Sequence, residues 1–290
     1  MIISRVILAV AVPLFAQAKS DKLVQSVKAR AKEPPPVSGK AQTDPFRRWV
    51  SSGSFADIYD DCAAPPEELR DPKDQALSKP VNGKKMWRRT QALKGEEVVI
   101  DGNGRDGWVH VSVPRQRISG WVHSSALGTD SGLASSFPPS SEGSPERKAF
   151  LQATKELEDK GTPYVWGGTS EAGVDCSGLV VVGFTKIGKS GLVPRTAKEQ
   201  YAGQAKKGQE LKLKAGDLIF TAKSGSPESI SHVMVYIGEG RIREAQQPGT
   251  RVLSTDAAGR LGFALQDDMQ VEQGKPGGGG TVYFGTYFQD

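Results

Sequence analysis

Residues 46–128 show a pattern of short apolar runs separated by glycine. Three of these runs, GEEVVIDG, GWVHVSVP and GWVHSSAL, are rich in valine and tryptophan. Runs of this length and composition, separated by tight turns, are typical of small antiparallel strands. The pattern therefore predicts a compact β barrel over this part of the chain.

The pattern changes in residues 146–290. In PERKAFLQATKELEDKG, apolar residues recur at helical spacing with charged residues between them. The later segment SGLVVVGFTKIG is apolar on nearly all sides, as expected of a buried helix. Four further segments have the composition of strands: GDLIFTA, HVMVYIG, GRIREAQ and TVYFGTYF. Two helices followed by an antiparallel sheet predict a domain of the α+β class.

Segments without such periodicity divide the chain. Residues 19–45 contain KEPPPVSGK, whose consecutive prolines favour an extended chain, and we interpret them as a tether. Residues 129–145 are rich in serine, proline and glycine, which indicates a linker between two folded domains. Residues 256–280 exceed what the predicted sheet requires, and we expect a flexible loop there.

The first 18 residues have the pattern of a cleaved secretory signal. Arg5 precedes an apolar stretch from Val6 to Phe15, and the segment ends in Ala-Gln-Ala. A membrane anchor is the alternative, but the apolar stretch is about half of the roughly 20 residues needed to span a bilayer. We therefore expect an exported protein, periplasmic or secreted and associated with the cell wall, without a membrane span after cleavage.

Composition and charge narrow the classes of partner. The formal net charge is +5, and lysine and arginine are interspersed with aspartate and glutamate, so nucleic acid is not an expected partner. The chain has no C-x-x-C and no H-x-x-x-H segment, so a zinc site lacks its ligands. We expect no metal and no cofactor, and we expect a monomer.

The chain has two cysteines, Cys62 and Cys176. They could pair, as cysteines of exported proteins often do. However, Cys62 lies in a polar, proline-containing stretch of the other predicted domain, which favours two free thiols. Asp175 is a good helix N-cap and would place Cys176 in the first turn, where the helix dipole favours a thiolate. The carboxylate of Asp175 opposes this effect.

A basic partner for Cys176 must come from three histidines. His110 and His123 fall in the predicted barrel and are expected to be structural, which leaves His232 at the start of HVMVYIG. Strand alternation places His232 on one face with Met234 and Tyr236, where it can face a packed helix. A hairpin turn at residues 238–240 brings residues 244–246 opposite, so either Glu244 or Gln246 could orient the imidazole.

The segments YVWGG, DCSGL, PRTAKEQ, GDLIF, HVMVYIG and IREA occur in an order that resembles the NlpC-type family of papain-like cell-wall cysteine peptidases. The resemblance covers about residues 147–250. It implies a papain-like fold in which Cys176 is the nucleophile and His232 is the general base and acid. It further implies that Glu244, at a position where many relatives have a second histidine, orients His232.

The same resemblance implies roles for four more residues. Tyr164 matches a tyrosine whose hydroxyl reaches the active site and assists the oxyanion, although a packing role is the alternative. Asp175 and Ser177 match positions that line the substrate cleft, and Arg195 belongs to the matching PRT motif.

The GWVHVSV and GWVHSSAL segments resemble the closing strands of bacterial SH3-like cell-wall domains.

Together these features predict an exported peptidoglycan endopeptidase. The resemblance implies hydrolysis of the amide between D-γ-glutamyl and a diamino acid, meso-diaminopimelate or lysine, in stem peptides, through a cysteine thioester. The SH3-like domain would bind the wall, restrict substrate access or serve as a spacer. The alternatives are a non-catalytic wall-binding protein and a secreted amidase toxin that acts on a competitor's wall.

Overall fold

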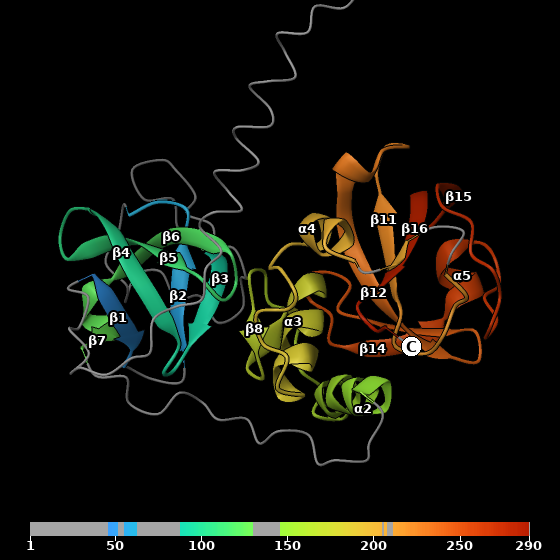
Figure 1. Ribbon diagram of the computed structural model, residues 1–290, viewed down its shortest axis with the longest axis horizontal. Helices are drawn as coiled ribbons and strands as arrows, with labels where there is room; N and C mark the ends of the chain where they lie inside the picture. Colours follow the sequence, from blue (N-terminus) through green and yellow to red (C-terminus); the bar gives the residue numbers. More distant parts are fainter. Residues whose placement is uncertain are drawn as a thin grey trace, which may run out of the picture. The chain divides into compact units, whose positions relative to one another are not determined.

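The computed structural model describes residues 46–51, 55–62, 88–129, 146–204, 206–207 and 211–289 (Figure 1). The expected signal peptide (1–18) and tether (19–45) lie outside the described residues, as does the expected linker 129–145 apart from Thr129. All described residues belong to one compact unit, 44–290.

Residues 46–128 contribute a seven-stranded antiparallel sheet, here called the N-terminal sheet, with strand order β3-β2-β6-β5-β4-β1-β7. Its strands are β1 (Arg47–Val50), β2 (Phe55–Tyr59), β3 (Arg88–Leu93), β4 (Glu97–Asn103), β5 (Trp108–Val113), β6 (Ile118–His123) and β7 (Leu127–Gly128). Strands β4 and β5 fall on the first two predicted runs, and their buried valines share one core. Strand β6 covers only the GWVH part of the third run, because Ser124–Ala126 form a short 3-10 helix. The assignment of this sheet to SH3-like domains stays a prediction.

Residues 146–289, here called the C-terminal domain, combine helices with an antiparallel sheet, as predicted. The helices are α2 (Glu146–Asp159), α3 (Cys176–Lys186), α4 (Ala197–Ala202), α5 (Ala257–Leu261) and the short η4 (Pro227–Ser229). The main strands are β10 (Lys206–Lys207), β11 (Leu218–Ala222), β12 (Ile230–Gly238), β13 (Arg241–Glu244), β14 (Leu253–Asp256) and β16 (Gly280–Thr286), in the order β10-β16-β11-β12-β13-β14. Strand β15 (Lys275–Gly277) pairs with β16, and β8 (Thr169–Ser170) pairs with β9 (Gly173–Val174).

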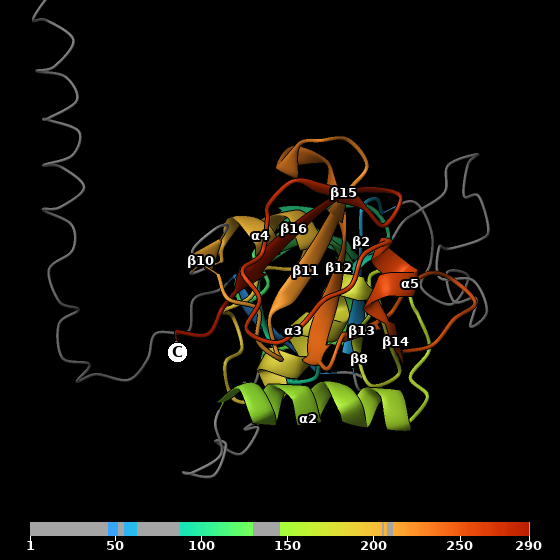
Figure 2. The same cartoon turned by 90° about the vertical axis from the view of Figure 1, so that its right-hand side faces the viewer.

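The sheet of the C-terminal domain is covered on both faces. Val233 and Val235 of β12 pack in one core with Phe150 of α2 and Phe184 of α3. Met234 and Tyr236, which alternate with them, pack in a second core with Ala257 and Leu261 of α5. Figure 2 shows β16, β11, β12 and β13 side by side, with α5 beside them. The predicted alternation along β12 is thus confirmed.

The expectation of a flexible loop at residues 256–280 is wrong. This segment contains α5 and β15, and its apolar side chains Leu261, Leu265 and Val271 are buried in the second core. The sheet is apolar on both faces, so the second face also needs a cover, and this segment supplies it. Its glycine-rich end forms the turn between β15 and β16.

Candidate active site

The first turn of α3 is fixed by a single carboxylate. Asp175 is the N-cap, and its Oδ1 accepts a hydrogen bond from the backbone N–H of Gly178 at 2.7 Å. Its Oδ2 accepts from the backbone N–H of Gly167 at 2.9 Å. Asp175 therefore ties the glycine loop before the helix to the helix itself, and Cys176 is the first helical residue, as predicted.

The glycine at position 178 is required by a close backbone approach. A Cβ atom added there would lie 1.9 Å from the carbonyl oxygen of Gly168. No heavier side chain fits at this distance without moving the loop or the helix. The spacing between the segment YVWGG and the segment DCSG therefore reflects contact between the loop and the first turn of α3.

Cys176, His232 and Glu244 come together in this domain. Cys176 is buried as a free thiol and lies close enough to His232 to influence its charge. The Nε2 atom of His232 lies 2.6 Å from Oε2 of Glu244, so the other ring nitrogen, Nδ1, remains for the thiol. Of the two residues left open by the sequence, Glu244 therefore contacts the imidazole, whereas Gln246 is exposed.

The charges around His232 favour its protonated form. Burial by itself lowers the pKa of His232, but the charge and hydrogen bond of Cys176, followed by those of Glu244, raise it to about 10. Burial likewise disfavours the Glu244 carboxylate, but His232 and Arg260 hold the pKa of Glu244 below its ordinary value. The arrangement favours an imidazolium at His232 beside the buried side chain of Cys176.

A β-bulge precedes His232. Thr221 of β11 pairs with His232, but Ala222 pairs with Ile230, which leaves Ser231 without a partner in the ladder. Bulges bend a strand and redirect the side chains beside them, and they are frequent next to active sites. The period-two pattern of the sequence does not reveal this bulge, because an unpaired residue is visible only in the strand pairing.

Arg260 is a site residue that the sequence analysis missed. It lies on α5, and its Nε donates to Oε1 of Glu244 at 2.9 Å while its Nη2 lies 3.4 Å from Oε2. The Glu244 carboxylate, 1% exposed, is thus shared between the imidazole and a guanidinium. The only sequence signal was an arginine in a segment taken for a loop.

Tyr164 lies close to the candidate nucleophile. Its side chain is buried, and burial together with the charges of Cys176 and Asp175 raises the pKa of its hydroxyl, whereas Arg195 opposes the rise. The hydroxyl therefore remains protonated and can donate a hydrogen bond. This location is compatible with both the predicted oxyanion role and the packing alternative, so the role stays a prediction.

Asp175, Ser177 and Arg195 form one buried cluster. Arg195 donates through Nη1 and Nη2 to the two oxygens of Asp175, at 3.0 and 2.6 Å, and through Nη1 to Oγ of Ser177 at 2.8 Å. Ser177 in turn donates to Oδ1 of Asp175 at 3.2 Å. These bonds join the three side chains to one another, and their predicted contact with substrate stays a prediction.

The remaining candidates lie outside this site. His110 pairs with Asp101, and His123 caps the short helix η2 (Ser124–Ala126), so both are engaged within the N-terminal sheet. Cys62 is a partly exposed free thiol.

Among the residues that the structure describes, no group of three or more His, Cys, Asp or Glu could hold a metal ion. In the same described ranges, no helix combines the length and apolar character needed to cross a bilayer.

Part of the C-terminal domain matches a known protein family. Residues 161–260 match the NlpC/P60 family. The bifunctional muramidase/DL-endopeptidase CwlT of Bacillus subtilis is 44% identical over 94 residues, which are 32% of this chain and 28% of that protein. The gamma-D-glutamyl-L-lysine dipeptidyl-peptidase of Bacillus subtilis is 40% identical over 93 residues, 32% of this chain and 30% of that protein.

A third relative is the murein DD-endopeptidase MepH of Escherichia coli, 37% identical over 112 residues, 38% of this chain and 41% of that protein. The chain thus spans less than half the length of these relatives. Among solved structures, an NlpC/P60 family protein from Bacillus cereus superposes with a TM-score of 0.52 at 20% identity, covering 72% of this chain and 94% of that chain. The two proteins share a fold.

Proposed function

Because residues 161–260 form an NlpC/P60 family domain with homologues named as peptidoglycan endopeptidases, we propose that this protein is an exported peptidoglycan endopeptidase. The observation that carries the proposal is that His232 lies near Cys176 and has its Nε2 held by Glu244 at 2.6 Å. A nucleophile, a base and a residue that orients the base are the three groups that cysteine-dependent amide hydrolysis requires.

In the proposed reaction, Sγ of Cys176 attacks the carbonyl carbon of the scissile amide, and His232 holds the proton of the thiol. The oxyanion is stabilised by backbone N–H groups in the first turn of α3, with Tyr164 as a further donor. His232 then donates the proton to the leaving amine as the C–N bond breaks and a thioester forms. Water, deprotonated by His232, attacks the thioester and releases the acid and the Cys176 thiol.

We further propose that the bond cleaved lies between D-γ-glutamyl and a diamino acid in stem peptides. Two relatives are named for activities of this kind, as a DL-endopeptidase and as a gamma-D-glutamyl-L-lysine dipeptidyl-peptidase. A third is named as a DD-endopeptidase, which cleaves a different bond. The specificity must therefore be measured with substrates that contain both bonds.

The test uses defined muropeptides with known stem peptides, and products are identified by mass spectrometry. Wild type is expected to release a fragment that begins with the diamino acid, and Cys176→Ala to release none. Cys62→Ala is the matched control, because it removes the other thiol and should cut as wild type does. Cleavage between two D-amino acids would overturn the proposed bond but not the proposal that the protein is a peptidoglycan endopeptidase. If wild type cuts no muropeptide but sediments with purified wall, the protein is a wall-binding protein and the enzyme proposal is wrong.

Export is part of the proposal and rests on the pattern of the first 18 residues. Expression of the full chain in a bacterium, followed by mass measurement of the protein outside the cytoplasm, tests it. A mature chain that begins at Lys19 is the expected result. An unprocessed chain that stays with the membrane would instead support the anchor alternative.

A further inference from the structure

The carboxylate that caps α3 is itself held by a residue that contacts the N-terminal sheet. Arg195 directs both terminal nitrogens of its guanidinium to Asp175. Its third donor, Nε, points elsewhere and donates to Oγ1 of Thr90 at 3.1 Å. Thr90 belongs to β3 of the N-terminal sheet and is fully buried. The orientation of the guanidinium therefore depends on a hydroxyl from outside the C-terminal domain.

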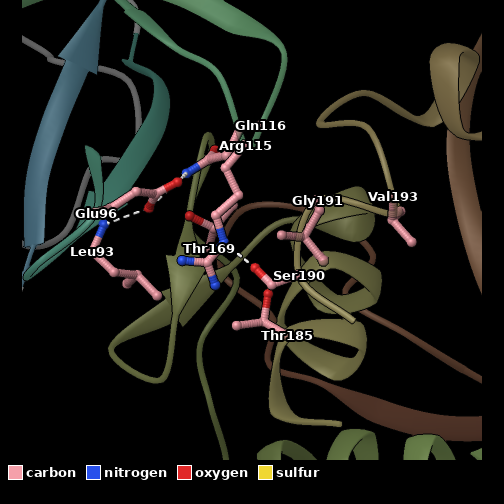
Figure 3. Close-up of a pocket in the computed structure, with 10 residues that line it drawn as sticks. Leu93, Glu96, Arg115, Gln116, Thr169, Thr185, Ser190, Gly191 and Val193 are labelled. Carbon is pink, nitrogen blue, oxygen red and sulfur yellow. Dashed lines mark hydrogen bonds between the residues drawn. The ribbon is translucent and has the colours of Figure 1, made fainter. Parts of the chain in front are cut away.

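The hydroxyl of Thr90 is held in one orientation by two hydrogen bonds. It accepts from Arg195, so its single hydrogen is available for one acceptor, and that acceptor is Oε1 of Gln116. Gln116 then donates through Nε2 to the backbone carbonyl of Gln91 at 2.8 Å and to the carboxyl oxygens of Glu96 at 3.1 and 3.2 Å. Figure 3 shows this last contact, between Gln116 and Glu96, at the edge of a pocket.

The result is a series of hydrogen bonds in which each side chain donates to the next. It runs from Arg195 through Thr90 and Gln116 to Glu96, and all four side chains are buried. At its other end, Arg195 meets Asp175, which holds the N–H groups of Gly167 and Gly178. Buried polar networks in which each member is satisfied fix one geometry, and removal of one member leaves the neighbours unpaired.

Other contacts between the N-terminal sheet and the C-terminal domain do not touch Arg195. The hydroxyl of Thr169 donates to the backbone oxygen of Gln91 at 2.9 Å. The hydroxyl of Ser170 donates to the side-chain oxygen of Gln91 at 3.0 Å. Arg88 donates to the carbonyl oxygen of Trp166 at 3.3 Å. These bonds also hold the N-terminal sheet to the C-terminal domain. A variant that loses one of them therefore shows the effect of a weaker interface without a change in the hydrogen bonds of Thr90.

We propose that Thr90 is a positioning residue for the nucleophile, which acts through Arg195 and Asp175 on the first turn of α3. The proposal rests on the proposed function, because it assumes that Cys176 is the nucleophile. It gives the N-terminal sheet a part in arranging the active site that does not depend on whether the sheet also binds the wall.

The experiment compares three variants of the full chain with wild type. Thr90→Val keeps the volume but removes the hydroxyl, and Thr90→Ser restores the hydroxyl. Ser170→Ala removes a buried hydroxyl from the same interface without touching Arg195 or the Gln91 carbonyl that Gln116 contacts. The measurements are kcat and KM on a cleaved muropeptide, the thermal midpoint, and the rate of iodoacetamide labelling at Cys176 relative to Cys62 in the same molecule, read by peptide mass spectrometry.

Thr90→Val is expected to lower kcat about tenfold with a smaller change in KM, because small misplacements of reacting groups are costly. Labelling of Cys176 relative to Cys62 should slow in the same variant and recover in Thr90→Ser. Ser170→Ala should lower the thermal midpoint and leave kcat and labelling near wild type. If Thr90→Val proves unfolded, Thr90→Ala removes the same hydroxyl without adding a methyl group at its place.

Equal kcat and labelling in Thr90→Val and wild type would overturn the proposal. So would equal losses in Thr90→Val and Ser170→Ala, because general loosening of the interface would then explain both. The labelling ratio needs no substrate. If wild type cleaves no muropeptide, the proposed function fails, and the labelling still tests whether Thr90 controls the environment of Cys176.

Discussion

Arg260 donates from Nε to Oε1 of Glu244 over 2.9 Å, while the other oxygen of that carboxylate lies 2.6 Å from His232. The two contacts fix both ends of the carboxylate in a buried position. A carboxylate held at only one oxygen could rotate away from the imidazole, so Arg260 supports the orientation of His232 through Glu244. Arg260 comes from α5, on the segment that the sequence analysis took for a loop.

Arg260→Met should weaken both stability and activity. It removes the guanidinium and leaves one oxygen of a buried carboxylate unpaired, which costs about 1–3 kcal/mol of unfolding free energy. Arg260→Lys keeps the charge but not the planar arrangement of donors, so it should recover part of the loss. Urea unfolding and kcat/KM on a muropeptide are the measurements. A stable Arg260→Met variant with wild-type activity would contradict the supporting role.

Glu244→Gln should move the alkaline limb of the pH profile to lower pH. The charge and hydrogen bond of Glu244 help to raise the pKa of His232 to about 10, so the loss of the charge lowers that pKa. The imidazolium that protonates the leaving amine is then lost at a lower pH. Gln246→Ala is the control, since Gln246 is exposed and should leave the profile unchanged. The measurement is kcat/KM between pH 6 and 11.

Protonated His232 should stabilise the fold in a defined range of pH. Its pKa is raised from the ordinary value of 6.5 to about 10 in the folded protein, so the folded state binds the proton more tightly. The stabilisation is fully present below 6.5 and disappears as the pH rises through about 10. Cys176→Ala removes the first of the groups that raise this pKa.

The measurement is urea unfolding of wild type and Cys176→Ala at several values of pH between 6 and 10.5. The stability of wild type relative to the variant should fall as the pH rises through this range. A difference that stays constant with pH would show that the thiol does not hold the proton on His232.

Gly178→Ala should destabilise the protein, because the added Cβ would lie 1.9 Å from the carbonyl oxygen of Gly168. The strain is expected to cost about 1–3 kcal/mol and to lower kcat, since the first turn of α3 must shift. Gly225→Ala is the matched control, because a Cβ there meets nothing within 4 Å. Thermal unfolding of both variants is the measurement. Similar midpoints for the two would contradict the close approach.

The elements that sequence predicted well depend on local periodicity. The valine runs of β4, β5 and β6, the buried helix after Cys176 and the alternation along β12 each repeat over a few residues, so a short window contains the signal. The N-cap role of Asp175 is local in the same sense. The hairpin between β12 and β13 limited the partner of His232 to two residues, and the structure selected Glu244.

The residues that sequence missed act through distant contacts. Arg260 follows Glu244 by 16 positions, and Thr90 precedes Arg195 by 105. No spacing rule connects such pairs, because they meet only when separate elements pack. Residues 256–280 differ from the expectation for a related reason: their apolar residues cover the second face of the sheet, and that burial exists only once the segment packs on the distant strands.

Strand β16 is the last strand in chain order, but it lies inside the sheet, between β11 and β10. During synthesis, β11 therefore has no partner on that side until residues 280–286 have been made. A nascent chain that stops before Gly280 carries Cys176, His232 and Glu244 but leaves the edge of β11 unpaired, open to other chains. The sheet that carries His232 and Glu244 is therefore complete only once this last strand is in place, and shortening the chain from this side exposes the edge of β11.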